Sequence, residues 1–144
     1  LLSARSRNET MAKYLSEQIA REMIRRGIGI GKSQILIFGF TFMANCRDCR
    51  NTKIASLARE LRSWGCGVSC ADPLADRDFA LREYGENVLC LEDLAEMKGQ
   101  YDAIVGAVAH DVFSSVSPQD FLRLHGFVYD IQNVFPGVPG RICL

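Results

Sequence analysis

The chain alternates short, almost wholly apolar runs with longer segments that carry apolar residues at helical spacing. The apolar runs are typical of buried β-strands and cover residues 34–38, 67–71, 87–89, 101–109 and 127–131. The segments between them predict helices at residues 52–64, 76–84 and 92–98, and a further helix that starts at residue 117. Apolar strands that alternate with amphipathic helices imply a parallel sheet covered on both faces. The predicted fold class is therefore α/β, with a doubly wound, mostly parallel, Rossmann-like sheet and helices on both faces.

The pattern of residues 8–26 predicts one long helix that precedes this sheet in the sequence. Apolar residues recur at every fourth position along it: Met11, Leu15, Ile19 and Met23. A glycine-rich linker follows, so we expect the helix to be an arm that leads into a separate globular body. Its apolar stripe must be buried against that body, against a missing domain or against a second copy of the chain.

Ligands bind to such sheets at the carboxyl ends of the strands, in the crevice where the winding reverses. The candidate site therefore lies in the loops that follow the strands, at residues 40–50, 72–76, 110–113 and 132–135. The first of these loops lacks the Gly-x-Gly-x-x-Gly pattern that lets a dinucleotide pyrophosphate approach the backbone. We therefore do not expect this part of the chain to bind the main body of NAD in the standard way.

Charged residues in these loops allow more than one interpretation. Arg47, Arg50 and Lys53 precede a predicted helix, where guanidinium groups and free helix N–H groups suit a phosphate, but a solvated basic loop has the same pattern. Asp72 is placed to accept a ribose hydroxyl or to form an Asp-Pro turn. His110 is placed to contact a ligand or to cap the next helix.

Composition narrows the function classes. The 144 residues are 48% hydrophobic and 24% charged, which suits one ordinary domain, in whose core we expect Trp64. Seventeen basic residues balance seventeen acidic ones with no basic block, which argues against a nucleic-acid partner bound by bulk electrostatics. The apolar runs are too short to span a bilayer, and we see no signal peptide. Because the first residue is Leu, we expect an excised piece of a longer protein.

Six cysteines in a chain with a full apolar core are fewer than a disulfide-stapled domain carries, so we infer a reducing, cytoplasmic setting. Cys46-x-x-Cys49 allows a redox or zinc interpretation, and its place before a helix favours a lowered thiol pKa. Zinc would need two further ligands, and no second paired motif exists. A chance pair is the alternative, and we predict no metal site.

Several segments together resemble one known family. Residues 39–53 are similar to the stretch Gly-Leu-Thr-Phe-Lys-Glu-Asn-Cys-Pro-Asp-Ile-Arg-Asn-Ser-Lys of the UDP-glucose/GDP-mannose dehydrogenase family, in particular its bacterial enzymes that oxidise UDP-N-acetyl-hexosamines. Further matches are Ala71-Asp-Pro73, Tyr84-Gly85, Tyr101-Asp-Ala-Ile104, Ala107-Val-Ala-His-Asp111 and Asp130. Residues 5–14 resemble the start of the family's central helix, which builds the dimer. Cys46 belongs to the family pattern, whereas Cys49 stands where an aliphatic residue is usual.

The resemblance implies different roles for different parts of the chain. Residues 1–30 would be the end of the dimerisation helix, and residues 31–144 would be the UDP-binding α/β domain. The family oxidises the C6 alcohol of a UDP-sugar to a carboxylate, for polysaccharide precursors, with NAD as cofactor. The catalytic cysteine and the NAD-binding domain lie upstream in the family, so the chain alone is expected to be inactive, with no catalytic residue of its own.

The resemblance also implies a set of ligand contacts. Phe42 matches the phenylalanine that packs at the UDP-sugar site, Asn8 lies in the helix-start motif near the substrate, and Arg50 matches the arginine that reaches the NAD phosphates. Two further substrate positions depart from the family, because Met43 and Gln132 stand where basic residues contact the ligand. A divergent, non-catalytic nucleotide-binding or dimerisation module that has lost these contacts is therefore the alternative to a working dehydrogenase.

Overall fold

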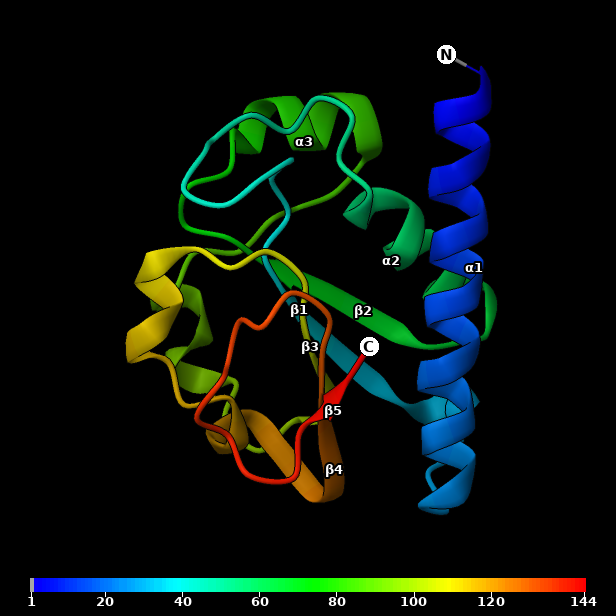
Figure 1. The fold of residues 1–144 in the computed structure, drawn as a ribbon. Helices are drawn as coiled ribbons and strands as arrows, with labels where there is room; N and C mark the ends of the chain where they lie inside the picture. The colour runs from blue at the N-terminus through cyan, green and yellow to red at the C-terminus, as the bar shows by residue number, and fades with distance from the viewer. Residues whose placement is uncertain (1) are drawn as a thin grey trace.

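The computed structural model describes residues 2–144, with side chains from residue 7 onward. Five parallel strands form one sheet in the order β2-β1-β3-β4-β5 (Figure 1). They are β1 (Gln34–Phe38), β2 (Gly67–Ala71), β3 (Tyr101–Gly106), β4 (Leu122–Asp130) and β5 (Ile142–Cys143). The order reverses between β1 and β3, which confirms the predicted α/β, Rossmann-like fold and places the crevice at the carboxyl ends of these two strands.

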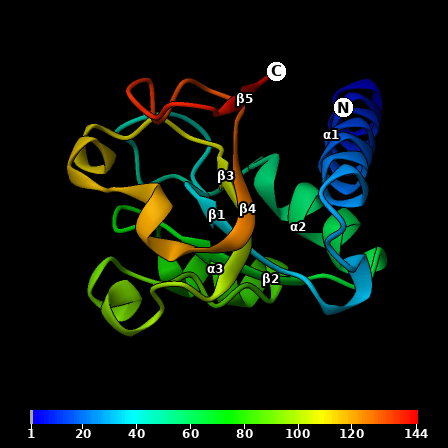
Figure 2. The ribbon, with the colours of Figure 1, turned by 90° about the horizontal axis from the view of Figure 1, so that it is seen from below.

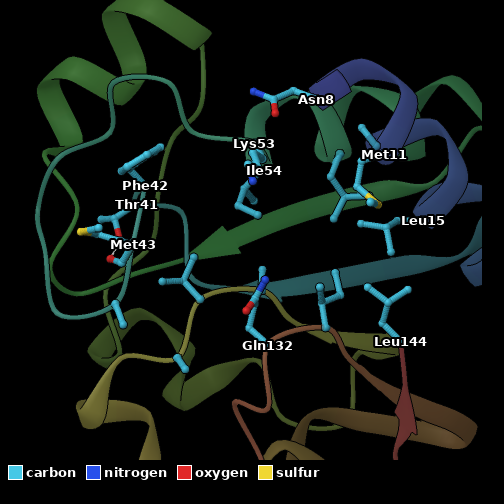
Figure 3. Close-up of a pocket in the computed structure, with 17 residues that line it drawn as sticks. Asn8, Met11, Leu15, Thr41, Phe42, Met43, Lys53, Ile54, Gln132 and Leu144 are labelled. Atoms are coloured by element: carbon cyan, nitrogen blue, oxygen red, sulfur yellow. Dashed lines mark hydrogen bonds between the residues drawn. The ribbon is translucent and has the colours of Figure 1, made fainter. Parts of the chain in front are cut away.

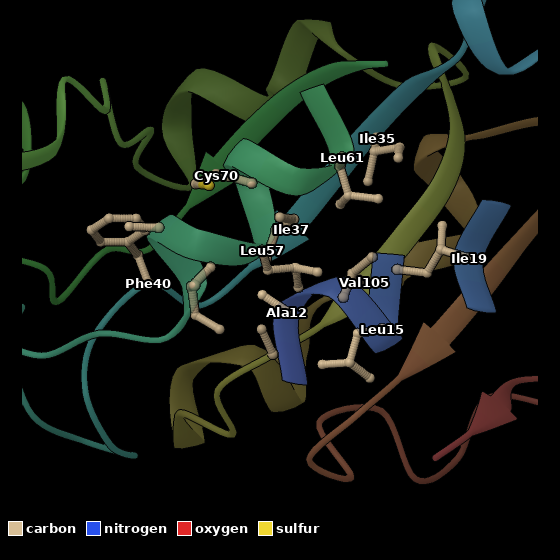
Figure 4. Packing of buried hydrophobic residues seen from close by; sticks show 14 of the residues in the cluster. Ala12, Leu15, Ile19, Ile35, Ile37, Phe40, Leu57, Leu61, Cys70 and Val105 are labelled. Atoms are coloured by element: carbon tan, nitrogen blue, oxygen red, sulfur yellow. The ribbon is translucent and has the colours of Figure 1, made fainter. Parts of the chain in front are cut away.

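The two faces of the sheet are covered differently. The α-helices α1 (Leu2–Arg25), α2 (Ile54–Ser63) and α3 (Arg77–Tyr84) contribute to the hydrophobic cluster on the face that carries Ile35 and Ile37 (Figures 2 and 4). The opposite cluster, around Leu36 and Phe38, includes residues of three short 3-10 helices. These are η2 (Glu92–Glu96), η3 (Asp111–Ser115) and η4 (Pro118–Phe121).

Helix α1 is part of the body. Leu15, Ile19 and Met23 are buried, and Arg26, just after the helix, donates to the Gly126 carbonyl of β4 at 3.1 Å. Of the three partners considered for the apolar stripe, the body is thus the one that covers it, although Met11 stays half-exposed. The division into residues 1–30 and 31–144 stays a prediction, and residue 1 and the side chains of residues 5 and 6 of the family motif lie outside the described residues.

The boundaries differ from prediction where local signals were weak. The predicted helix at residue 117 is only the 3-10 turn η4, and Ser117 makes no side-chain cap bond. Strand β4 starts at Leu122 because a register irregularity between Tyr101 and Ala103 lets the exposed residues before Phe127 join the sheet. The helix predicted at residues 92–98 is the 3-10 helix η2 (Glu92–Glu96), and within residues 87–89 only Leu89 forms a bridge, to Ala71 of β2.

Trp64 does not lie in the core as expected. Its side chain is 43% exposed, and its indole N–H donates to the Ser16 hydroxyl across the α1–α2 contact at 3.4 Å. Amphipathic spacing placed Trp64 on the apolar face of α2, but the residue caps the helix where that face reaches solvent. The indole N–H therefore finds its hydrogen-bond acceptor at the edge of the core rather than inside it.

Candidate functional site

A cavity of about 430 Å³ opens at the carboxyl ends of the strands, between α1, α2 and the loops after β1, β3 and β4 (Figure 3). Most of its walls are apolar. The lining residues are Asn8, Met11, Ala12, Leu15, Thr41, Phe42, Met43, Ala44, Lys53, Ile54, Leu57, Ala107, Val108, Ala109, Ile131, Gln132 and Leu144. A concave, mainly apolar space with a few polar groups is the usual form of a small-molecule site.

The structure brings together four of the five residues for which the resemblance implied ligand contacts. Asn8 from α1, Phe42 and Met43 from the loop after β1, and Gln132 from the loop after β4 all line the cavity (Figure 3). Phe42 and Met43 are each about half-exposed, so their side chains are available to a ligand. Arg50 is not among the lining residues. The ligand roles of all five stay predictions.

The loop after β1 is held against the neighbouring loop by a close backbone approach. Gly39 has a φ of +102°, and a Cβ placed there would lie 2.5 Å from the Cβ of Val108 and 2.6 Å from its backbone nitrogen. Only glycine combines that backbone conformation with such close contact. This contact places the loop after β1 beside the loop after β3, and each loop forms one wall of the cavity.

Asp72 organises the same loop from the end of β2. One carboxylate oxygen, Oδ2, accepts from the backbone N–H groups of Phe40 at 2.7 Å and Thr41 at 3.2 Å, and the other accepts from those of Leu74 and Ala75. The side chain is fully buried. Of the two interpretations left open, the Asp-Pro turn is therefore the one found, and no ribose hydroxyl can reach Asp72.

His110 completes this network. Its Nδ1 accepts from the Asn45 backbone N–H at 2.8 Å, so the ring proton is on Nε2, which donates to Asp72 Oδ2 at 2.7 Å. Burial opposes the charge of Asp72, but the hydrogen bonds from His110 and the backbone amides outweigh it and hold the pKa of Asp72 below its ordinary value. His110 is also fully buried. It therefore supports the loop: it is not among the residues that line the cavity, and its side chain makes no cap bond to η3.

The three basic residues of this loop lie in different surroundings. Arg50 donates from Nε and Nη2 to both carboxylate oxygens of Asp48, at 3.0 and 2.9 Å, and this hydrogen-bonded arginine lowers the pKa of Asp48. Arg47 lies 3.9 Å from the Asp76 carboxylate. Lys53 alone of the three lines the cavity. The three do not converge on one anion site, so of the two interpretations left open the solvated basic loop is the one found.

The cysteine pair does not form a dithiol site. Cys49 is buried and directs its thiol at the Arg47 carbonyl at 3.6 Å, while Cys46 is partly exposed. Burial raises the pKa of the Cys49 thiol, contrary to the lowered pKa expected from its place before a helix. Among the described residues, no group of three or more His, Cys, Asp or Glu side chains is arranged to hold a metal ion. Within the same part of the chain, no helix has the length and apolarity needed to span a membrane.

Some features of the site carried no usable signal in the sequence. Leu15 lines the cavity although its spacing marks it only as a buried helix residue. Leu144 lines it because β5, a strand of two residues, brings the end of the chain beside β4. A two-residue strand is too short for periodicity to indicate.

A parallel sheet with a cavity at its switch point defines a nucleotide-binding type of α/β domain. Residues 36–137 match the UDP-binding domain of the UDP-glucose/GDP-mannose dehydrogenase family, and the chain belongs to that family. It is 38% identical over 143 residues to the UDP-N-acetyl-D-glucosamine 6-dehydrogenase of Salmonella typhi, covering 94% of this chain and 32% of that protein. It is 32% identical to the protein of the same name from Pseudomonas aeruginosa, covering 92% and 31%.

Solved structures show the same fold. A UDP-D-ManNAc dehydrogenase from Pyrococcus horikoshii superposes with a TM-score of 0.71 at 22% identity, over 94% of this chain and 30% of that one. The chain thus spans about a third of the length of the relatives it matches.

Proposed function

We propose that this chain is the UDP-sugar-binding part of an NAD-dependent nucleotide-sugar 6-dehydrogenase, which oxidises the sugar C6 alcohol to a carboxylate. The observation that carries the proposal is the gathering of Asn8, Phe42, Met43 and Gln132 around one cavity. The names of the relatives from Salmonella typhi and Pseudomonas aeruginosa support the choice of a UDP-N-acetyl-hexosamine as substrate. Because the chain covers about a third of those relatives, it acts with the rest of the protein and is inactive by itself.

The role of the chain is then positioning. The half-exposed Phe42 ring offers a flat apolar surface, and the amides of Asn8 and Gln132 can donate to or accept from ligand oxygens. Holding a nucleotide in one orientation presents the sugar C6 to groups supplied by the rest of the protein, which converts a bimolecular encounter into a unimolecular step.

Titration calorimetry of this chain with UDP and UDP-N-acetylglucosamine tests the proposal. The matched variant is Met43→Lys/Gln132→Lys, which supplies two basic side chains at the cavity. We expect the unmodified chain to bind both ligands and the double variant to bind them more tightly, since each charge-assisted hydrogen bond contributes about 1.5–3 kcal/mol. Binding by the double variant alone would favour the non-catalytic module, and no binding by either would contradict the proposal for the isolated chain.

The cofactor of the whole protein is proposed to be NAD, with Arg50 as the contribution of this chain. The Arg50 side chain is 73% exposed, and its Nη1 takes no part in the bonds to Asp48, so donors remain for a phosphate. NAD, when bound, supplies the hydride acceptor. Arg50→Ala in the full-length protein should raise the KM for NAD, whereas Arg47→Ala should not. An unchanged KM would remove Arg50 from the cofactor site.

We also propose that the whole protein is a cytoplasmic homodimer assembled through α1. Tyr14 and Ile24 on this helix are 48% and 65% exposed, which leaves apolar surface for a second copy, and free, buried Cys66 and Cys70 suit a reducing setting. Sedimentation of the full-length protein with Tyr14→Glu/Ile24→Glu should show a shift towards monomer. An unchanged dimer would contradict the use of this surface.

A further inference from the structure

Few of the side chains that line the cavity are charged. Of its seventeen lining residues, all with described side chains, Lys53 is the sole one with a charged side chain. The remaining polar lining side chains are uncharged: Asn8, Thr41 and Gln132. A ligand phosphate in this cavity therefore has one candidate counter-charge among the lining side chains, and no Asp or Glu side chain lines the cavity to repel it.

The surroundings of Lys53 keep its charge available. Arg47 and Arg50, in the same loop, face Asp76 and Asp48, whereas Lys53 forms none of the ion pairs found among the side chains of residues 7–144. Its side chain also makes no cap bond to α2 and is exposed. The lysine is thus free to turn to a ligand without breaking a contact of the fold.

The position of Lys53 adds a second favourable contribution. It immediately precedes the ten-residue helix α2, and Ile54 and Leu57 of the first turn line the same cavity. The first turn of α2 contains no acidic residue. The positive end of the helix dipole and the ammonium group therefore act on the same side of the cavity.

We propose that Lys53 is the residue that binds the diphosphate of the nucleotide ligand. This inference rests on the proposed function and deepens it: the apolar walls around Phe42 hold the nucleoside, and the ammonium group of Lys53 at the start of α2 holds the charged part. The cavity then distinguishes a nucleoside diphosphate from a nucleoside mainly through one side chain.

Calorimetric titrations with uridine, UMP and UDP test this assignment. Lys53→Met keeps the length and apolar stem of the side chain and removes the charge, and Lys53→Arg keeps a charge. The matched control is Lys32→Met, an exposed lysine before β1, at the opposite end of the strand from the cavity. Thermal unfolding of each variant checks that the fold is retained.

We expect Lys53→Met to weaken UDP binding about 10- to 100-fold, the effect of one charge-assisted hydrogen bond, and to leave uridine binding unchanged. Lys53→Arg should retain most of the affinity, and added salt should weaken UDP binding to the unmodified chain more than to Lys53→Met. Equal UDP affinity in Lys53→Met and Lys32→Met would overturn the assignment while leaving the proposed function intact. An unmodified chain that binds none of the three ligands would overturn both.

Discussion

Replacement of Asp72 by Asn removes the centre of the network that shapes the cavity loop. The carboxylate accepts five hydrogen bonds, from four backbone N–H groups and from His110, and it is fully buried. In Asp72→Asn, one of the two oxygens becomes an NH₂ group that points at N–H donors. Whichever way the amide turns, at least two N–H donors lose their acceptor.

The expected cost follows from that count. Each donor left without an acceptor costs about 1–3 kcal/mol, so Asp72→Asn should lower the free energy of unfolding by about 2–6 kcal/mol. With a urea slope of about 1–3 kcal/mol per molar, the unfolding midpoint should fall by at least about 0.7 M. Asp111→Asn, at an exposed side chain next to His110, is the matched control and should change the free energy by no more than about 0.5 kcal/mol. If Asp72→Asn unfolds as the control does, the network does not stabilise the loop.

A fall in pH should also destabilise the fold through Asp72. Because the pKa of Asp72 is lowered in the folded state, its contribution to stability is complete above the ordinary carboxyl value of 3.8 and is lost as the pH falls through the lower folded value. Urea unfolding between pH 3 and pH 7 should therefore show a steeper loss of stability in acid for the unmodified chain than for Asp72→Asn. Parallel curves for the two proteins would refute this assignment.

Two further predictions concern the backbone and the thiols. Gly39→Ala should destabilise the chain by roughly 2–4 kcal/mol in urea unfolding, because a Cβ would meet Val108 at a positive φ, whereas Gly27→Ala has open space and should cost about 1–2 kcal/mol; equal losses would contradict the close contact. Titration of thiols with a disulfide reagent should separate two classes, because burial shields one set and, as at Cys70, raises the thiol pKa. The expected fast class is Cys46, Cys90 and Cys143, and the slow class is Cys49, Cys66 and Cys70; six equally fast thiols would refute the packing.

The sequence predicted the fold well where a single physical signal dominated. The all-apolar run at β1 and the apolar stripe of α2 identified a buried strand and its covering helix, and their burial confirms both. The loop positions of Phe42 and Gln132 also followed, because carboxyl ends of parallel strands meet at one edge. Local patterns could not indicate the start of β4, which depends on a register shift against β3.

The polar network was the part that the sequence left undecided. Asp72 and His110 are 38 positions apart, and either residue alone fits a ligand contact as well as a support role. The decision depends on burial and on which backbone N–H groups face the carboxylate, and both are set by tertiary packing. Likewise, whether Arg47, Arg50 or Lys53 faces the cavity depends on the partners that Asp48 and Asp76 provide.

The cavity draws its walls from segments far apart in the sequence, since Asn8 and Leu15 belong to α1 and Leu144 follows β5. A molecule bound there would contact segments that are more than one hundred positions apart and would hold them together. By mass action, a ligand at one hundred times its Kd would add about 2.7 kcal/mol to the stability of the closed form. Loss of the contact between α1 and the loops would in turn empty the site, so occupancy and the resistance of these segments to proteolysis rise and fall together.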